Sequence, residues 1–153
     1  MIEIQAPHPL IYPENYLSCF VAGSIELGKA INFQRELVNS FQGKDIAFFN
    51  PRRDDFDPYA KQVIENDYFR GQVEWELDAL DRANLIVMYF DPNTKSPISL
   101  LELGLHAKSK KLIVCCPEGF WRKGNVDIVC RRYGIEQVET FEELVEAIKK
   151  RIL

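Results

Sequence analysis

Apolar and polar residues follow one another in blocks that predict strands and helices in turn. Short apolar runs bounded by turn residues are typical of strands buried in a parallel sheet. Five segments are predicted as strands, the last of them a short edge strand: 17–23, 45–51, 84–90, 111–117 and 136–139. The segment 84–90, NLIVMYF, is apolar almost throughout, so we expect it at the centre of the sheet.

Between the strands, apolar residues recur close to helical spacing. Helices are predicted within the segments 25–43, 69–83, 96–109, 119–134 and 140–153. Two of these helices carry clear start signals. Ser96 is expected as an N-cap with Pro97 at the first helical position, and Thr140 with Glu143 is expected to form a capping box.

This alternation predicts an α/β fold, a flavodoxin-like or Rossmann-like three-layer sandwich with a five-stranded, mostly parallel sheet. The 153 residues fit one domain, 1–153, in which residues 1–15 form an N-terminal arm. Ligands of such sheets bind in the crevice beyond the carboxyl ends of the strands. The loops at that crevice are therefore the place to look for a site: 23–28, 50–69, 91–99 and 117–127.

Composition narrows the functional classes. The net charge of −4 argues against a general binder of nucleic acid or of anionic membranes. No apolar run approaches the ~20 residues that span a bilayer, and the first residues lack the basic region of a signal peptide. The four cysteines match no zinc pattern, so we expect reduced, mostly buried thiols in a cytoplasmic protein: Cys19, Cys115, Cys116 and Cys130.

The first two crevice loops offer small and polar residues. Gly23 would let a ligand approach the backbone and Ser24 offers a hydroxyl, although a tight turn with a helix cap explains both. Neither the GxGxxG fingerprint nor the P-loop pattern is present. Asn50 ends the second strand, and Arg52 with Arg53 could hold an anion. Three aspartates follow closely, so a solvated charged loop is an equally good interpretation.

Glu76 is a candidate because of its distance from the central strand. It lies eight residues before Asn84, where that strand begins. Two helical turns back along an antiparallel helix place it near the crevice end of the sheet. Most of the other acidic residues of this helix are expected to face water.

Glu102 allows two interpretations. Ser99, Glu102 and His106 lie at i, i+3 and i+7 and share one helix face, which predicts a solvated stripe. Three apolar residues share another face, which is expected to pack on the sheet: Ile98, Leu101 and Leu105. Against the solvated stripe, Glu102 lies near the start of the helix after the central strand, where crevice residues belong. His106 has no second histidine at ligand spacing, so acid–base chemistry would rest on carboxylates.

Four stretches, taken in order, resemble the nucleoside 2-deoxyribosyltransferase superfamily, and within it the nucleoside 2-deoxyribosyltransferase-like branch. They read FVAGSIELGKAINFQ, NPRR, QVEWELDALDRANLIVMYFDP and SPISLLELGLHAKSKKLIVCCPEGFWRKGNVDIV. The resemblance runs from about residue 17 to residue 130. It implies a flavodoxin-like fold and cleavage of the N-glycosidic bond of a nucleoside or nucleotide.

The resemblance also implies roles for single residues. Glu102, in the ELG motif, corresponds to the nucleophile that attacks C1′ of the deoxyribose, and Glu76 to the carboxylate that contacts the base and manages its proton. Ser96 corresponds to a residue that helps to hold the substrate. Asn125 corresponds to an asparagine that reaches the neighbouring subunit's site and binds the sugar 5′ end, with Asp127 two places on. A homodimer or larger homo-oligomer with shared active sites is therefore expected.

The chemistry agrees with these residue types. A carboxylate beneath C1′ stabilises the oxocarbenium character of the transition state and can bond to it, as in retaining glycosidases, and no cofactor or metal is needed. Relatives that act on monophosphates carry an arginine where this chain has Glu26, and Glu26 with Asp127 would repel a phosphate. Four cations keep the nucleotide alternative open: Arg52, Arg53, Arg122 and Lys123. A third alternative is a nucleotide-binding module on the same fold without turnover.

Overall fold

A computed structural model describes residues 1–24 and 32–152 of the chain. Its strands form one sheet in the order β1-β3-β2-β4-β5-β6, and every neighbouring pair is parallel. The strands are β1 (Ile2–Gln5), β2 (Leu17–Gly23), β3 (Ile46–Asn50), β4 (Leu85–Tyr89), β5 (Leu112–Cys115) and β6 (Glu136–Val138). The predicted central strand is β4, which lies between β2 and β5, so its central position is confirmed.

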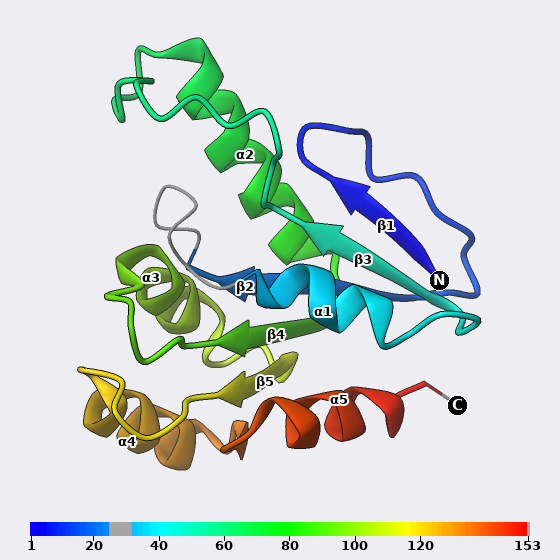
Figure 1. Cartoon of the computed structure of the whole chain (residues 1–153), viewed down its shortest axis with the longest axis vertical. Helices are drawn as coiled ribbons and strands as arrows, with labels where there is room; N and C mark the ends of the chain where they lie inside the picture. The colour runs from blue at the N-terminus through cyan, green and yellow to red at the C-terminus, as the bar shows by residue number, and fades with distance from the viewer. Residues whose placement is uncertain (25–31, 153) are drawn as a thin grey trace.

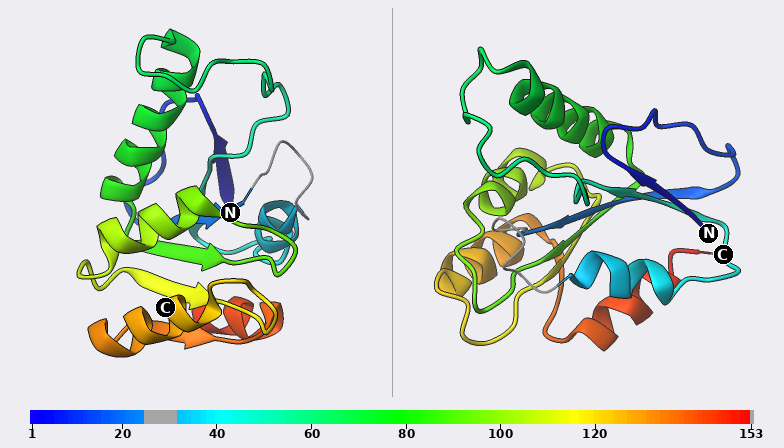
Figure 2. Two further views of the ribbon diagram at one scale, coloured as in Figure 1. Left: turned by 90° about the vertical axis from the view of Figure 1, so that its left-hand side faces the viewer. Right: turned by 45° about the horizontal axis from the view of Figure 1, so that its top comes forward.

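Helices cover both faces of the sheet (Figures 1 and 2). The helices are α1 (Phe33–Asn39), α2 (Asp67–Arg82), α3 (Pro97–His106), α4 (Lys123–Tyr133) and α5 (Phe141–Lys149). Residues of α2, α3 and α4 share one buried cluster with one face of the sheet, and residues of α1 and α5 share a second cluster with the other face. The predicted three-layer α/β fold is therefore confirmed. Glu26 lies outside the described residues.

The sheet has six strands where five were predicted. The additional strand is β1, which pairs with β3 at the edge of the sheet. Only Ile2 and Ile4 of this strand are apolar, and they alternate with polar residues because an edge strand is only half buried. So short an alternation gives no apolar run that would mark a strand.

The rest of the predicted N-terminal arm crosses α2. Trp75 donates from Nε1 to the carbonyl oxygen of His8 over 2.8 Å, and Arg82 donates to that of Leu10 over 2.9 Å. Tyr12 packs edge-on against Phe49 with ring centroids 5.3 Å apart. These contacts hold the segment and α2 together on the same side of the sheet.

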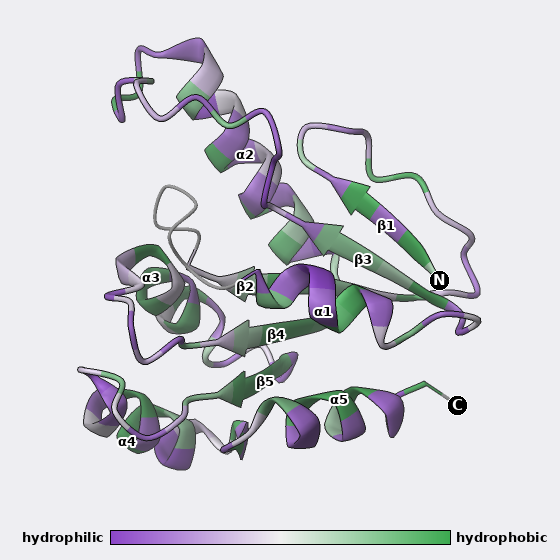
Figure 3. Ribbon diagram, viewed as in Figure 1, coloured by the Kyte–Doolittle hydropathy of each residue, from purple (hydrophilic) through white to green (hydrophobic). Residues whose placement is uncertain are grey.

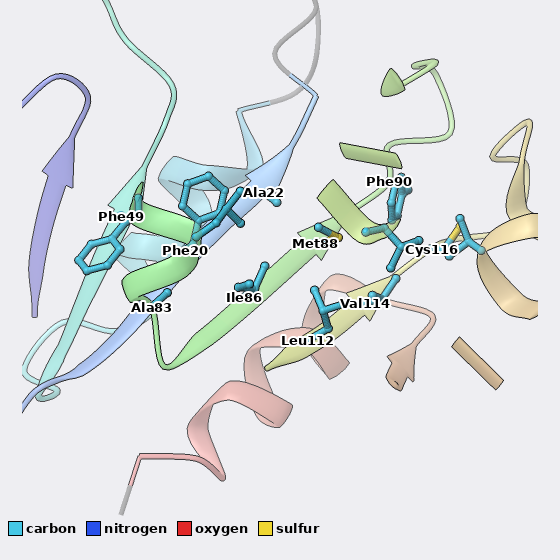
Figure 4. Close-up of a cluster of buried hydrophobic side chains, with 14 of the residues drawn as sticks. Phe20, Ala22, Phe49, Ala83, Ile86, Met88, Phe90, Leu112, Val114 and Cys116 are labelled. Atoms are coloured by element: carbon cyan, nitrogen blue, oxygen red, sulfur yellow. The ribbon is translucent and has the colours of Figure 1, made fainter. Parts of the chain in front are cut away.

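The interior strands are buried on both faces, which explains their continuous apolar sequences. Figure 4 shows Phe20, Phe49, Ile86 and Met88 in the cluster on the α2–α3–α4 side, and Figure 3 shows β4 and β5 as hydrophobic along their length. The four cysteines are buried and unpaired, as predicted. Burial raises the pKa of Cys115 and Cys116 to about 12, so these thiols stay protonated. No helix in the described ranges is both long and apolar enough to cross a membrane.

Candidate active site

Buried polar residues gather directly after β4. Most buried positions of the described chain are apolar, yet one segment of twelve positions, 91–102, contributes five buried polar residues: Asp91, Thr94, Ser96, Ser99 and Glu102. Burying a polar group costs free energy unless it finds partners, so such a concentration at the carboxyl end of the central strand indicates a functional site.

Helix α3 presents to the sheet the face that was predicted to be solvated. Ser99 and Glu102 are only 4% and 8% exposed, whereas Ile98, Leu101 and Leu105 are 58%, 60% and 58% exposed. The prediction that these three apolar residues pack on the sheet is therefore wrong, and so is the solvated interpretation of Glu102. The spacing of residues determines which ones share a face, but the orientation of the helix decides which face is buried.

Two carboxyl groups from different helices, the buried Glu102 and the half-buried Glu76, interact electrostatically here. Burial, and to a smaller extent the charge of Glu76 on α2, raise the pKa of Glu102 on α3 to about 8. Burial also raises the pKa of Glu76 to about 7, opposed by a hydrogen bond from Gln72. The two carboxyls therefore lie within electrostatic reach of each other, and both change protonation near neutral pH.

Glu76 is held by a residue that the sequence analysis did not single out. Gln72 donates from Nε2 to Oε1 of Glu76 over 2.9 Å and to the carbonyl oxygen of Pro51 over 3.0 Å. Gln72 lies four positions before Glu76 on α2. Residues four apart on a helix are neighbours, so this spacing was the available signal.

The loop before α3 is shaped by its own polar side chains. Thr94 donates from its hydroxyl to the carbonyl oxygen of Asp91 over 2.9 Å, and its Oγ1 lies 2.7 Å from Oγ of Ser96. Asp91 accepts from the backbone N–H of Asn93 over 2.9 Å. Ser96 stands at the N-cap position as predicted, but with a left-handed backbone, φ 48°, and without a side-chain capping bond. Asp91 and Thr94 were missed, although polar residues after the central strand are where such a site is expected.

Gly23 and Ser24 end β2 beside α1. A Cβ atom on Gly23 would stand 2.1 Å from Cε1 of Phe33, whose ring also packs on Tyr89 with centroids 5.0 Å apart. The space left by the missing side chain is thus filled by an aromatic ring, and the glycine allows α1 to approach the sheet. Ser24 is half-buried.

The side-chain amide of Asn50 forms hydrogen bonds within the protein through both its nitrogen and its oxygen. Its Nδ2 donates to Oε1 of Glu3 over 2.7 Å, and its Oδ1 accepts from the backbone N–H of Arg52 over 3.0 Å. Burial lowers the pKa of the half-buried Arg52, and the charge of Arg35 lowers it further. Asn50 therefore shapes the turn after β3 and positions the backbone of Arg52.

Asn125 and Asp127 lie on α4 in different surroundings. Asn125 is exposed in the first turn of the helix. Asp127 accepts from Nζ of Lys123 over 3.2 Å and from Nε2 of Gln137 over 2.5 Å. Lys123 also donates to Glu139 over 3.1 Å, so Asp127 belongs to a network that ties α4 to the end of β6.

Of the predicted site residues, Glu76 and Glu102 interact electrostatically across α2 and α3, and Ser96 and Ser99 are buried at the start of the helix that carries Glu102. Asn50 and Asp127 take part in separate hydrogen-bond networks. Over the ranges that the structure describes, no group of three or more His, Cys, Asp or Glu side chains is placed to hold a metal ion.

Comparisons with known proteins agree with this fold. A conserved protein from Enterococcus faecalis V583, known from its crystal structure, superposes with a TM-score of 0.63 at 14% sequence identity, over 89% of this chain and 99% of that one. A search of curated proteins found no match. Residues 16–120, most of the chain, match the family described as "Nucleoside 2-deoxyribosyltransferase like". The chain therefore belongs to the nucleoside 2-deoxyribosyltransferase-like family.

Proposed function

We propose that the protein is an enzyme that cleaves the N-glycosidic bond of a nucleoside, with Glu102 as nucleophile and Glu76 as the group that exchanges a proton with the base. The observation that carries this proposal is the interacting pair of carboxyls, the buried Glu102 on α3 after β4 and the half-buried Glu76 on α2, both with a raised pKa. Family membership supports the same chemistry.

The proposed reaction is a double displacement. The carboxylate of Glu102 attacks C1′, and the C1′–N bond breaks with its electron pair going to the base, which takes the proton of the Glu76 carboxyl. The sugar is then bound to Glu102 as an ester. In the second half, the nitrogen of another base, or a water molecule, attacks C1′, gives its proton to Glu76 and releases the Glu102 carboxylate.

The protonation of the pair suits these roles. The reaction needs one ionised carboxyl and one protonated carboxyl, and pKa values of about 7 for Glu76 and about 8 for Glu102 leave the pair partly protonated at neutral pH. The proposed roles require any proton on Glu102 to shift to Glu76 when substrate binds. A base nitrogen that accepts from Glu76 favours this shift.

The test is turnover by the purified protein. A deoxynucleoside is incubated with a second free base and both are followed by chromatography, with Glu102→Ala as the variant and Glu74→Gln, an exposed glutamate on α2, as its matched control. We expect Glu102→Ala to lower the rate by about 10³-fold or more and the control to keep wild-type activity. Equal traces for wild type and Glu102→Ala across a panel of nucleosides would overturn the proposal.

The products distinguish the remaining alternatives. Transfer to the second base identifies a transferase, and release of the first base without exchange identifies a hydrolase. Stabilisation by a nucleoside in a thermal-shift assay, with no product after long incubation, identifies a binding module without turnover.

We propose a substrate with a free 5′-hydroxyl, because the cations named as phosphate ligands take part in other interactions. Arg53 pairs with Asp55 at 2.9 Å, and Arg122 stacks on Trp121 at 4.4 Å. Lys123 is bound to two carboxylates, as described above. Faster cleavage of a nucleoside 5′-monophosphate than of its nucleoside would reverse this assignment.

We further propose a homo-oligomer in which the exposed apolar residues of α3 are covered by a second copy. Ile98, Leu101 and Leu105 form an apolar stripe on the side of α3 away from the sheet, and Ile128 on α4 is 68% exposed. Adjacent exposed apolar residues mark association surfaces. Asn125 is exposed on α4, where it is free to reach a neighbouring subunit.

The oligomer and its shared sites are tested together. Light scattering after gel filtration should show a dimer or larger for wild type and a smaller species for Leu101→Asp. If Asn125 serves the neighbouring site, mixing Glu102→Gln with Asn125→Ala should restore about a quarter of wild-type activity in a dimer, since half of the reassorted dimers hold one intact site. A monomer that is fully active would exclude shared sites.

A further inference from the structure

Gln72 connects α2 to the loop after β3. Its Nε2 donates to Oε1 of Glu76 and to the carbonyl oxygen of Pro51, the residue that directly follows β3. Both donor hydrogens of the amide are therefore used. Because Pro51 belongs to the crevice edge of the sheet and Glu76 to the helix above it, the amide fixes the Glu76 carboxyl relative to that edge.

The surroundings determine which way the Gln72 amide faces. Exchanging its nitrogen and oxygen would set a carbonyl oxygen against the carbonyl oxygen of Pro51, where no donor is available. In the orientation observed, Oε1 of Gln72 is buried and lacks a hydrogen-bond partner among residues 1–24 and 32–152.

This unpaired oxygen argues that stability does not explain the glutamine. A buried acceptor without a partner destabilises the folded state, and such groups in native proteins call for a specific reason. An unbranched apolar side chain of similar length would fill the same space without that cost. The two hydrogen bonds that Gln72 donates, to Glu76 and to Pro51, therefore distinguish it from a packing residue.

We propose that Gln72 is a positioning residue for the reaction proposed above: by donating to Oε1 of Glu76, it leaves Oε2 as the oxygen that gives a proton to the nucleobase and takes one back. A protonated carboxyl carries its hydrogen on one oxygen and accepts through the other. With Oε1 committed to the amide, the proton resides on Oε2. The carboxyl then has a single orientation toward the substrate in both halves of the double displacement.

The hydrogen bond also adjusts how readily Glu76 changes its protonation. Burial favours the neutral acid, whereas a donated N–H favours the carboxylate, and the two opposing effects leave the Glu76 pKa at about 7. Glu102, on α3, is an ionisable group that interacts electrostatically with Glu76 from another helix. A group that both donates and accepts a proton works best when its pKa is near the working pH.

The experiment compares Gln72→Met with wild type by carboxyl ¹³C NMR titration of glutamate-labelled protein, by thermal unfolding and by pH profiles of kcat and KM. We expect the Glu76 titration to move up by about one pH unit, because the donor to its carboxylate is lost. We expect the melting temperature to stay the same or to rise. We expect kcat to fall about 10–100-fold, with KM nearly unchanged and the pH optimum shifted upward.

Two further variants keep the result interpretable. Gln42→Met changes an exposed glutamine after α1 in the same way and should leave the titration and both kinetic constants unchanged. Gln72→Asn keeps the amide but shortens the side chain, so it tests the same contact if Gln72→Met does not fold. The proposal is overturned if the Glu76 titration superposes on that of wild type in the Gln72 variants. It is also overturned if kcat falls equally at every pH together with the melting temperature, which is the result of a purely structural role.

The NMR titration does not need turnover. A wild-type protein without activity on any nucleoside would remove the proposed function, whereas an unchanged titration would remove the role of Gln72 by itself.

Discussion

Helices α3 and α5 cover opposite faces of the same sheet and differ in how far their apolar side chains are buried. Helix α5 buries Leu144, Val145, Ala147 and Ile148 and begins with a complete capping box at Thr140 and Glu143. Helix α3 buries Ser99 and Glu102 beside Leu103 and leaves three large apolar residues more than half exposed: Ile98, Leu101 and Leu105. The comparison teaches that α5 stabilises the fold, whereas α3 buries polar residues on its inner side, where we propose the active site, and exposes apolar residues on its outer side, where we propose a partner.

The test of this comparison with the largest expected effect is the pH dependence of stability. Glu102 has a pKa of about 8 in the folded protein, against an ordinary value of 4.5 for a glutamate side chain. The folded state therefore keeps a proton that the unfolded state has lost, so this group makes stability fall as pH rises from about 4.5 to about 8. Glu102→Gln removes that loss, and we expect a gain of up to about 4–5 kcal/mol in the free energy of unfolding at pH 9. Little difference is expected at pH 4.

Denaturant unfolding at several pH values measures this effect. Glu146→Gln on α5 is the control, because Glu146 is fully exposed and bound to Lys149. Its stability curve should run parallel to that of wild type. If Glu102→Gln also ran parallel, Glu102 would not be a buried acid in the folded protein.

The second test removes apolar volume from each helix. Leu144 is fully buried, so Leu144→Ala should lower the free energy of unfolding by about 2–5 kcal/mol. Leu101 is 60% exposed, so Leu101→Ala should change it by less than about 0.5 kcal/mol at protein concentrations where both variants are monomeric. Chemical denaturation followed by circular dichroism measures both. Equal losses would show that α3 buries its leucines in the monomer.

The test with the smallest expected effect concerns the N-cap of α5. The Thr140 side chain accepts from the backbone N–H of Glu143 over 3.2 Å, and Thr140→Ala should cost about 1 kcal/mol. Differential scanning calorimetry should resolve the corresponding drop in melting temperature. Thr140→Ser keeps the hydroxyl and should restore most of the stability; a serine variant as unstable as the alanine variant would assign the loss to packing.

The sequence was sufficient for the interior strands. Segments such as LSCFVAG and NLIVMYF are buried on both faces, so their composition alone carries the signal. The sequence was insufficient to predict β1, because Ile2 and Ile4 are the only apolar residues of that strand. Its pairing partner, β3, lies more than forty residues further along the chain. An edge strand of this kind is specified by its partner, which is a long-range property.

The sequence was also insufficient for the orientation of α3. Helical spacing groups Ser99 with Glu102, and Leu101 with Leu105, but either group can face the sheet. The choice depends on the chain path through the loop before the helix, where Thr94 and Ser96 contact each other and Ser96 is left-handed. That geometry is a tertiary property, and hydrophobicity alone predicted the opposite face.

The carboxyl pair was partly predictable. Counting back from the central strand identified Glu76, and the position of Glu102 after that strand identified it as a crevice residue. Gln72 was not predicted: its spacing of four residues marks it as a neighbour of Glu76 on the helix, but its second contact, with the carbonyl oxygen of Pro51, depends on the fold.

The arrangement of α3 has a consequence for how this segment can vary between related chains. Successive residues of a helix point about 100° apart, so Leu101 and Glu102 face different surroundings from adjacent positions. A single inserted or deleted residue before Leu101 would rotate all later side chains together and place a leucine where the carboxyl stands. Substitutions at Ile98, Leu101 and Leu105 could change the partner surface gradually, but the number of residues between Pro97 and Glu102 can change only at the expense of the site.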